Sequence, residues 1–475
     1  MKSMKGLSNN RRQGNVAPQR SKHRTFSPRD DAQEYRARFI LKFIFYLGLA
    51  ATAAFYIARE WGNNRGIYAQ LWSLHTHYAL LTRVNPANEK MLFSVETSLD
   101  RAYRLLKFAP IIDTHNDLPF KVELLTGGGN LSAMDLYNLP KEWYQTDIVR
   151  LKQGRVGALF YSAYVDCYNY TWQTDNLKKT LEQIDLVKRI IAKYPHEFEF
   201  ATSTTDIKRI TSTGKIASLI GLEGGHQIDA SMGTLRMMYD LGVRYMTLTH
   251  SCATAWADSS NPPFVHDGLG PDGAKFIYEM NRLGIMVDLS HVSHKVMDQT
   301  IRTSAAPVIF SHSSVFAITN HTRNVPDDIL QLVKEKDGVV MINFYKEYVR
   351  GVEDVGDAVG MGRVVEHMLH VKNLIGARHL GMGADYDGDI VPVDGLEDVS
   401  KYPILIASLL EHGFTDDEIV GVTGGNLLRV FEKVEKVAHA MQQAHKPIEE
   451  MGMDVAKRCP DTQPERRAGL TNKGC

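Results

Sequence analysis

Eight short runs of apolar residues recur along the chain, and each run ends in a polar residue that can bind a metal ion or move a proton. Segments with helix-like spacing fill most of the gaps, and residues 176–194 repeat apolar side chains at i, i+3, i+4 and i+7. The runs occupy residues 109–117, 156–164, 216–223, 243–250, 285–291, 307–312, 338–345 and 379–385. Strands that alternate with helices form parallel βαβ units, so this pattern predicts a TIM-like (β/α)8 barrel of the α/β class.

The helix-like segments also give the expected boundaries of the barrel domain. Residues 364–375 carry helical spacing before the eighth run, and residues 404–412 and 415–434 carry it after that run. The chain that follows is rich in proline, glycine and charge, which is typical of a loose tail. We therefore expect a barrel domain at 105–440 and a polar C-terminal tail at 441–475.

The polar residues that end the runs are expected to meet at one place, because the C-terminal strand ends of a barrel converge on a single mouth. One histidine at a strand end is more often structural, but here the placement repeats from run to run. The residues at these positions are His115, Asp117, Glu223, His250, His291, His312 and Asp385. Histidines without this placement are interpreted as structural, namely His226, His266, His294, His321, His367, His370 and His379.

The residue types at the expected mouth are those of a metal centre. His115 and Asp117 lie two positions apart, so in extended backbone both side chains can reach one ion. Glu223 lies in a Gly-Leu-Glu-Gly-Gly segment, and its two carboxylate oxygens can bridge two cations. His291 and His312 supply neutral imidazoles for a second ion. Mixed nitrogen and oxygen ligands suit Zn²⁺, and Mn²⁺ or Co²⁺ would also fit. The pattern predicts a metallohydrolase.

A basic segment and a long apolar run precede the barrel. Residues 1–38 hold ten Lys and Arg against three Asp and Glu, in a polar composition typical of disorder. Residues 39–58 are apolar except for Lys42, and about 20 helical residues cross a bilayer core of about 30 Å. The basic excess before this run predicts a cytosolic N-terminus. We expect a single-pass type II protein with a transmembrane signal anchor, a lumenal stalk at 59–104 and a lumenal or extracellular barrel.

The alternative interpretation of residues 39–58 is a cleaved signal peptide. The preceding segment is unusually long for that role, and no clear small-x-small cleavage site follows the apolar run. An uncleaved anchor is therefore favoured over a signal peptide.

Cysteines and glycosylation sequons agree with an oxidising compartment. Cys167 follows the second run and Cys252 follows the fourth, so the two could pair across the mouth. Asn130, Asn169 and Asn320 begin Asn-x-Ser/Thr sequons. Cys459 and Cys475 lie in the polar tail and receive no assignment.

Global charge gives no sign of a nucleic-acid partner, because 55 basic residues balance 55 acidic ones. A hydrophobic content of 44% is ordinary for a globular protein, and the length accommodates a barrel with appendages. A homodimer is possible, and the sequence does not decide the oligomeric state.

Seven motifs follow one another over about residues 105–435. They read IIDTHNDLP, LIGLEGG, YMTLTHSCATAWADSS, VDLSHVS, VIFSHSS, TRNVPDDIL and GADYDG. Together they resemble the membrane dipeptidase (renal dipeptidase) family of the amidohydrolase superfamily. The resemblance implies a zinc-dependent exopeptidase that hydrolyses dipeptides to free amino acids.

The resemblance also implies roles for particular residues. His115 and Asp117 would bind one zinc ion, the other would be bound by His291 and His312, and Glu223 would bridge the two. His250 and Arg323 would contact substrate, Asp385 would handle the proton, and Cys167 and Cys252 match a disulfide of the family. The family's mammalian members carry a cleaved signal and a lipid anchor, whereas this chain has an N-terminal apolar run and no apolar C-terminal tail. The mode of membrane attachment is therefore not carried over.

The expected chemistry follows from these roles. Two zinc ions that share a water lower its pKa toward neutrality, and the resulting hydroxide attacks the peptide carbonyl. The ions and His250 stabilise the oxyanion, while Asp385 passes the proton to the leaving amine. Asp387 is the rival for the proton role. Arg323 offers a fork for a free carboxylate; without the resemblance, a surface arginine paired with Asp327 or Asp328 would be favoured.

Two further interpretations stay open. A related barrel metallohydrolase would cleave another amide, such as a β-lactam, with the same metal ligands. A membrane-tethered binding protein with a decayed site belongs to a different class, and the intact set of candidate ligands argues against it. Asn343 and Tyr345 end the seventh run and are candidates to line the pocket, without a catalytic role.

Overall fold

The computed structural model describes residues 96–167, 175–354, 356, 358–444 and 446–448. The predicted cytosolic tail, the predicted anchor at 39–58 and the predicted stalk up to residue 95 lie outside these residues. Among the helices within the described ranges, none has both the length and the apolar character needed to cross a membrane.

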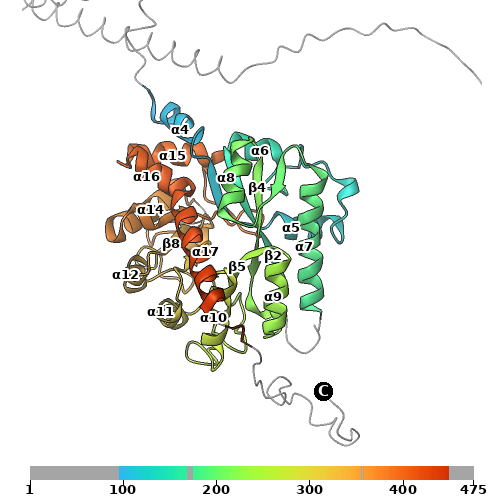
Figure 1. The fold of residues 1–475 in the computed structure, drawn as a ribbon. Helices are drawn as coiled ribbons and strands as arrows, with labels where there is room; N and C mark the ends of the chain where they lie inside the picture. The colour runs from blue at the N-terminus through green and yellow to red at the C-terminus, as the bar shows by residue number, and fades with distance from the viewer. Residues whose placement is uncertain (1–95, 168–174, 355, 357, 445, 449–475) are drawn as a thin grey trace, which may run out of the picture. The chain divides into compact units, whose positions relative to one another are not determined.

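Eight parallel strands form the barrel, and each coincides with one of the predicted runs (Figure 1). They are β1 (Ile111–Asn116), β2 (Val156–Tyr164), β4 (Ile216–Glu223), β5 (Val243–Thr247), β6 (Met286–Asp288), β7 (Ile309–Phe310), β8 (Val339–Ile342) and β9 (Leu380–Met382). They are hydrogen-bonded in chain order from β1 to β9. The predicted (β/α)8 architecture is confirmed.

Backbone contacts between β1 and the segment after β9 complete the ring. Asn116 and Tyr386 form an isolated parallel bridge. The Asp385 amide donates to the His115 carbonyl at 3.2 Å, and the Asp117 amide donates to the Tyr386 carbonyl at 2.8 Å. The first and last strands therefore meet where the candidate ligands lie.

One strand was not predicted. β3 (Phe198–Phe200) pairs in parallel with residues 216–218 of β4. It lies on the same edge of β4 as β5, which pairs farther along the strand with residues 220–223. Three residues with an acidic centre are too short for a recognisable apolar run. β3 therefore extends the sheet beside β4 without entering the ring.

Helices cover the strands, as the predicted periodicity requires (Figure 1). Helix α7 (Asn176–Lys193) begins at residue 176, where the helical spacing starts in the sequence, and it buries Thr180, Ile184, Val187 and Ile191 along one stripe. The other helices are α4 (Ser98–Leu106), α5 (Leu118–Thr126), α6 (Ile148–Gln153), α8 (Thr204–Ser212), α9 (Met232–Asp240), α10 (Gly273–Leu283), α11 (His294–Thr303), α12 (Asp327–Glu335), α13 (Lys346–Val349), α14 (Met361–Ile375), α15 (Tyr402–Glu411), α16 (Asp416–Val420) and α17 (Asn426–Ala444).

Helices at the two ends of the described chain extend past residues 105 and 440, since α4 begins at Ser98 and α17 ends at Ala444. Helix α4 packs against α15 and buries Ala102 and Leu106. The helix predicted at 415–434 is interrupted between α16 and α17 by a π-helical turn, Gly421–Gly425. A Cβ on Gly424 would lie 2.5 Å from Cγ1 of Ile112, so glycine allows this turn to pass close beneath β1.

The interior of the barrel changes from apolar to polar along several strands. In β2, Phe160 belongs to a buried apolar cluster, and Ser162 is the next residue on the same face. In β8, Met341 belongs to the same cluster and Asn343 follows on its face. Because side chains alternate along a strand, residues two apart share the interior. The apolar part stabilises the barrel, and the polar part forms the site.

Candidate metal centre

The structure brings all seven predicted strand-end residues together at one end of the barrel. They form three overlapping groups whose potential ligand atoms lie within 4.8 Å of one another. The groups are His115, Asp117 and Asp385; His115, Glu223 and His312; and Glu223, His250 and His291. His115 and Glu223 each occur in two groups, so the site is one continuous cluster.

Glu223 lies at the centre of this cluster. Its Oε1 is 3.1 Å from Nε2 of His291 and 3.3 Å from Nε2 of His312. Its Oε2 is 3.4 Å from Nε2 of His115 and accepts a hydrogen bond from Ser162 Oγ at 3.0 Å. Burial favours the neutral acid, but the three imidazoles outweigh it and lower the pKa of Glu223 well below its usual range. The residue is therefore a carboxylate whose two oxygens face different histidines.

His115 and Asp117 form one side of the cluster. Nε2 of His115 is 3.2 Å from Oδ2 of Asp117 and 3.8 Å from Oδ1 of Asp385. Asp117 is the residue before α5 rather than part of β1, so a turn, not strand alternation alone, brings it beside His115. Nε2 of His115 and both carboxylate oxygens of Asp117 are buried without a hydrogen-bond partner. Buried polar atoms of this kind are costly unless a ligand satisfies them.

His291 and His312 form the other side. Their Nε2 atoms lie 2.8 Å apart, and both face Oε1 of Glu223. Burial is the main cause that lowers the pKa of both rings well below the ordinary histidine value. Neutral imidazoles are the form that binds metal. His291 has a left-handed backbone with φ of 66°, a conformation that is uncommon for residues other than glycine.

This donor set fits divalent metal ions. Neutral imidazole nitrogens and carboxylate oxygens converge from both sides of Glu223, and several of these atoms have no protein partner. Such mixed ligands are those of Zn²⁺ and related first-row ions.

Asp385 and Asp387 have different surroundings, although they lie two residues apart. Asp385 is in the cluster, and its Oδ2 accepts a hydrogen bond from Asn343 Nδ2 at 2.9 Å. Burial raises the pKa of Asp385 well above its usual value, so it holds a proton readily. Asp387 instead accepts from the Gln145 amide at 2.7 Å, and its own amide donates to Gln145 Oε1 at 2.6 Å. Burial raises the pKa of Asp387 to about 6, but its contacts anchor a loop.

Arg323 is a buried residue, 2% exposed, and not a surface arginine. Its Nη1 donates to Ser313 Oγ at 3.1 Å and its Nη2 to the His312 carbonyl at 3.1 Å. Its Nε is buried without a partner. Asp327, one of the suggested carboxylate partners, lies 2.8 Å from His370 instead. A guanidinium with spare donors therefore lies against the backbone of a ligand residue.

His250 lines the same cluster beside His291, with ring centroids 4.3 Å apart. Burial lowers the pKa of His250 to about 4, so its ring is neutral near pH 7. Its Nε2 is 3.9 Å from Glu223 Oε1, and its Nδ1 is 3.1 Å from Ser251 Oγ. A neutral ring here can donate one hydrogen bond to a bound molecule.

Several residues that support the site were not predicted. Tyr245 Oη is 2.8 Å from Nδ1 of His115, and Ser311 Oγ is 2.8 Å from Nδ1 of His312. Ser162 contacts Glu223, and Asp288 lies behind Ser311. The missed signal is the alternation within the strands, because Ser162, Asp288 and Ser311 follow the interior residues Phe160, Met286 and Ile309 at a spacing of two.

Cys167 and Cys252 form a disulfide, with sulfurs 2.09 Å apart and Cα atoms 5.8 Å apart. His226 lies near Cys167, but sulfurs bonded to each other are not thiolate ligands, so this trio is not a metal site. Histidines interpreted as structural mostly contact backbone carbonyls, as His226 does with Val165 at 2.8 Å. None of them belongs to the ligand cluster in the described chain.

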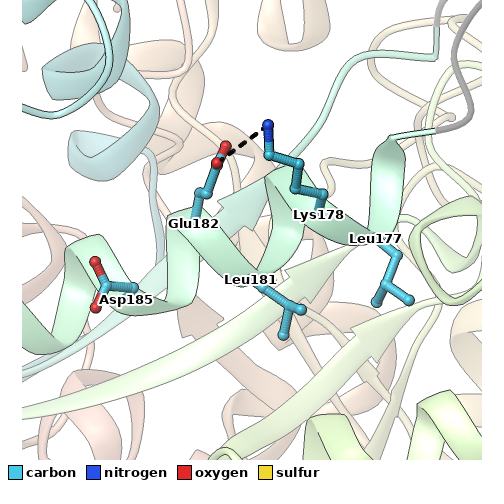
Figure 2. A pocket seen from close by; sticks show the side chains of 5 residues that line it. All are labelled: Leu177, Lys178, Leu181, Glu182 and Asp185. Carbon is cyan, nitrogen blue, oxygen red and sulfur yellow. Dashed lines mark ion pairs between the residues drawn. The ribbon is translucent and has the colours of Figure 1, made fainter.

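A separate hollow lies on the solvent side of α7 (Figure 2). Its walls are Leu177, Lys178, Leu181, Glu182 and Asp185. Lys178 and Glu182 form an exposed ion pair at 3.6 Å, which contributes little to stability. The hollow contains none of the candidate ligand residues.

A family comparison agrees with this geometry. Residues 99–445 match the family model described as membrane dipeptidase, peptidase family M19. The chain belongs to the membrane dipeptidase family. It is thus a metallopeptidase of the dipeptidase type, which confirms the predicted family and enzyme class.

Individual proteins that resemble this chain agree with its assignment to the family. An uncharacterised dipeptidase of Schizosaccharomyces pombe is 42% identical over 368 residues, which are 74% of this chain and 87% of that protein. A probable dipeptidase from Pseudomonas aeruginosa has a TM-score of 0.64 at 22% identity, over 72% of this chain and 99% of the other. A metallopeptidase from Rhodobacter sphaeroides, liganded with a phosphinate mimic of the dipeptide L-Ala-D-Ala, has a TM-score of 0.62 at 23% identity, over 68% and 99%. The two solved structures share the fold.

Proposed function

We propose that this member of the membrane dipeptidase family hydrolyses small dipeptides that carry a free C-terminal carboxylate, with two zinc ions at the barrel mouth. The observation that carries the proposal is Arg323, a buried guanidinium with unused donors directly behind the ligand His312. The phosphinate dipeptide mimic in the Rhodobacter sphaeroides structure is consistent with a dipeptide-sized substrate. A free carboxylate is the anion that a guanidinium fork recognises best.

The proposed metal ligands are divided by Glu223. His115 and Asp117 would hold one ion, the other would be held by His291 and His312, and each oxygen of Glu223 would serve one ion. This assignment is supported by Oε1 facing His291 and His312 while Oε2 faces His115. Bound zinc ions supply Lewis-acid polarisation of the peptide carbonyl and an activated water.

The protein groups supply positioning and proton transfer. Arg323 would hold the substrate carboxylate and so fix the peptide bond relative to the cluster. His250, neutral near pH 7, would donate a hydrogen bond to the carbonyl oxygen as negative charge develops there. Asp385, whose pKa is raised by burial, would take a proton and give it to the leaving amine.

The number and division of the metal ions can be measured directly. We expect about two zinc ions per chain, loss of activity on chelation and recovery with added zinc. Glu223→Gln should lower the occupancy of both sites, since it removes the shared negative charge. His291→Ala should mainly empty one of the two metal sites, the one that His291 and His312 would form. Metal analysis by mass spectrometry distinguishes these results, and full zinc occupancy in Glu223→Gln would exclude a bridging role.

Substitution of two neighbouring carboxylates tests which of them transfers the proton. Asp385→Asn should keep fold and metal but lose about 10²–10⁴-fold in kcat, because an amide cannot transfer the proton. Asp387→Asn is the matched control, since Asp387 contacts Gln145 and not the cluster. Steady-state kinetics on both variants would reverse the assignment if Asp387→Asn alone were inactive.

Substrate selection depends on Arg323. Charged hydrogen bonds of about 1.5–3 kcal/mol would favour dipeptide acids over C-terminally amidated dipeptides. Arg323→Ala should narrow the difference in kcat/KM between the two forms. Arg323→Lys should restore only part of it, because a point charge cannot match two oxygens in one plane.

The comparison of dipeptide acids with C-terminally amidated dipeptides also tests the alternative, a related barrel metallohydrolase that cleaves other amides. Equal hydrolysis of acids and amides by the unmodified enzyme would remove Arg323 from substrate recognition. Cleavage of β-lactams or other cyclic amides under those conditions would then favour a broader amidohydrolase.

We also propose that residues 39–58 anchor the chain as a type II membrane protein with a lumenal or extracellular catalytic domain. The apolar run, the Cys167–Cys252 disulfide and exposed sequon asparagines at 130 and 320 support this topology. In sealed microsomes, residues 1–38 should be digested by external protease while the barrel is protected and carries N-glycans. A mature protein that begins near residue 60 would instead identify a cleaved signal peptide.

A further inference from the structure

Asp288, at the end of β6, is fully buried behind the candidate metal ligands and has no assigned role. Its Oδ1 accepts hydrogen bonds from two backbone amides, Ser290 at 3.1 Å and Ser311 at 2.8 Å. Its Oδ2 accepts from the Ser311 hydroxyl at 2.5 Å. The carboxylate is therefore held on both oxygens, and each oxygen has a defined donor.

The Ser311 hydroxyl transmits this arrangement to His312. A hydroxyl has one proton, and that of Ser311 is directed at Asp288. Ser311 Oγ can then only accept in its 2.8 Å contact with Nδ1 of His312. Nδ1 of His312 must carry the ring proton, and Nε2 must present its lone pair toward Glu223 and His291.

We infer that Asp288 is a positioning residue that acts through Ser311 to keep His312 in the tautomer able to bind metal through Nε2. The inference rests on the proposed metal role of His312. Groups behind a histidine ligand commonly set its tautomer and the strength of metal binding. The other side of the centre lacks this constraint, because Nδ1 of His115 faces the Tyr245 hydroxyl, which can donate or accept.

Asp288→Asn tests the inference because the site dictates how the amide must lie. Two backbone amides point at Oδ1, so the asparagine oxygen has to occupy that position. Its NH₂ group then faces Ser311 Oγ as a donor. The other acceptor near the Ser311 hydroxyl, Ser290 Oγ, lies at 3.4 Å, whereas Nδ1 of His312 lies at 2.8 Å. We therefore expect the hydroxyl to donate to Nδ1 of His312, which moves the ring proton to Nε2. Asp288→Asn, which conserves the shape of the side chain, should therefore convert His312 from the Nδ1–H to the Nε2–H tautomer instead of leaving a mixture of the two.

Ser311→Ala should have a smaller effect, since it leaves Nδ1 of His312 without a partner and the tautomer undetermined. In the double variant, Asp288→Asn should add no further loss, because the hydroxyl that transmits its effect is gone. Ser314→Ala is the matched control. Ser314 is equally buried and close in sequence, but its hydroxyl has no hydrogen-bond partner.

Two measurements on the full chain test the inference. Zinc retention is followed during titration with a chelator, and ¹⁵N NMR of labelled histidines reports the His312 tautomer after metal removal. We expect Asp288→Asn to weaken retention on the order of 10- to 100-fold, Ser311→Ala to weaken it less, and Ser314→Ala to match the unmodified chain. We expect an Nδ1–H tautomer in the unmodified chain and Nε2–H in Asp288→Asn.

The zinc measurement and the tautomer measurement can contradict different claims. An Nδ1–H tautomer in Asp288→Asn, or additive losses in the double variant, would overturn the positioning role of Asp288 even if zinc binds normally. Absence of zinc binding by the unmodified chain would instead overturn the proposed metal function, while the tautomer measurement still decides the inference. If Asp288→Asn does not fold, an unchanged Nδ1–H tautomer in Ser311→Ala overturns the inference.

Discussion

Closure of the parallel sheet between its first and last strands is the constraint on which the site depends. The backbone hydrogen bonds from Asp385 to His115 and from Asp117 to Tyr386 join segments that are about 270 residues apart in the sequence. These bonds are made by the candidate ligand residues themselves. The link that closes the barrel thus also places His115 and Asp117 beside Asp385.

A second constraint is the electrostatic cost of burial. Glu223, Asp117 and Asp385 lie within one buried cluster that also contains four imidazoles, and desolvation opposes the charge on each carboxylate. The histidines offset this cost at Glu223, whose pKa falls, but not at Asp385, whose pKa rises. Two residues with the same functional group thereby differ in how readily they hold a proton, as the roles proposed for them require.

Much of the fold is predictable from sequence because a buried parallel strand is a continuous apolar run with a polar end. Residues 156–164 and 216–223 coincide with β2 and β4 for this reason. β3 is not predictable, since three residues give no periodicity. Gly424 interrupts the predicted helix at 415–434 through its approach to Ile112, a tertiary contact that helical spacing does not encode. The positions of the candidate ligands follow from the strand ends, whereas Ser311 and Asp288 are short polar residues whose importance depends on which atoms they face.

His312 contacts both Arg323 and the cluster of candidate ligands, through different parts of one residue. Its ring faces Glu223 and His291, while its carbonyl accepts a hydrogen bond from Arg323. The next residue, Ser313, accepts the other guanidinium contact, and the preceding residue, Ser311, contacts the ring. Three consecutive residues therefore determine where the arginine fork lies relative to the ligand cluster. Because these contacts are buried, the fold itself fixes where the guanidinium lies relative to the candidate ligands, and the proposed recognition of a free carboxylate requires such a fixed position.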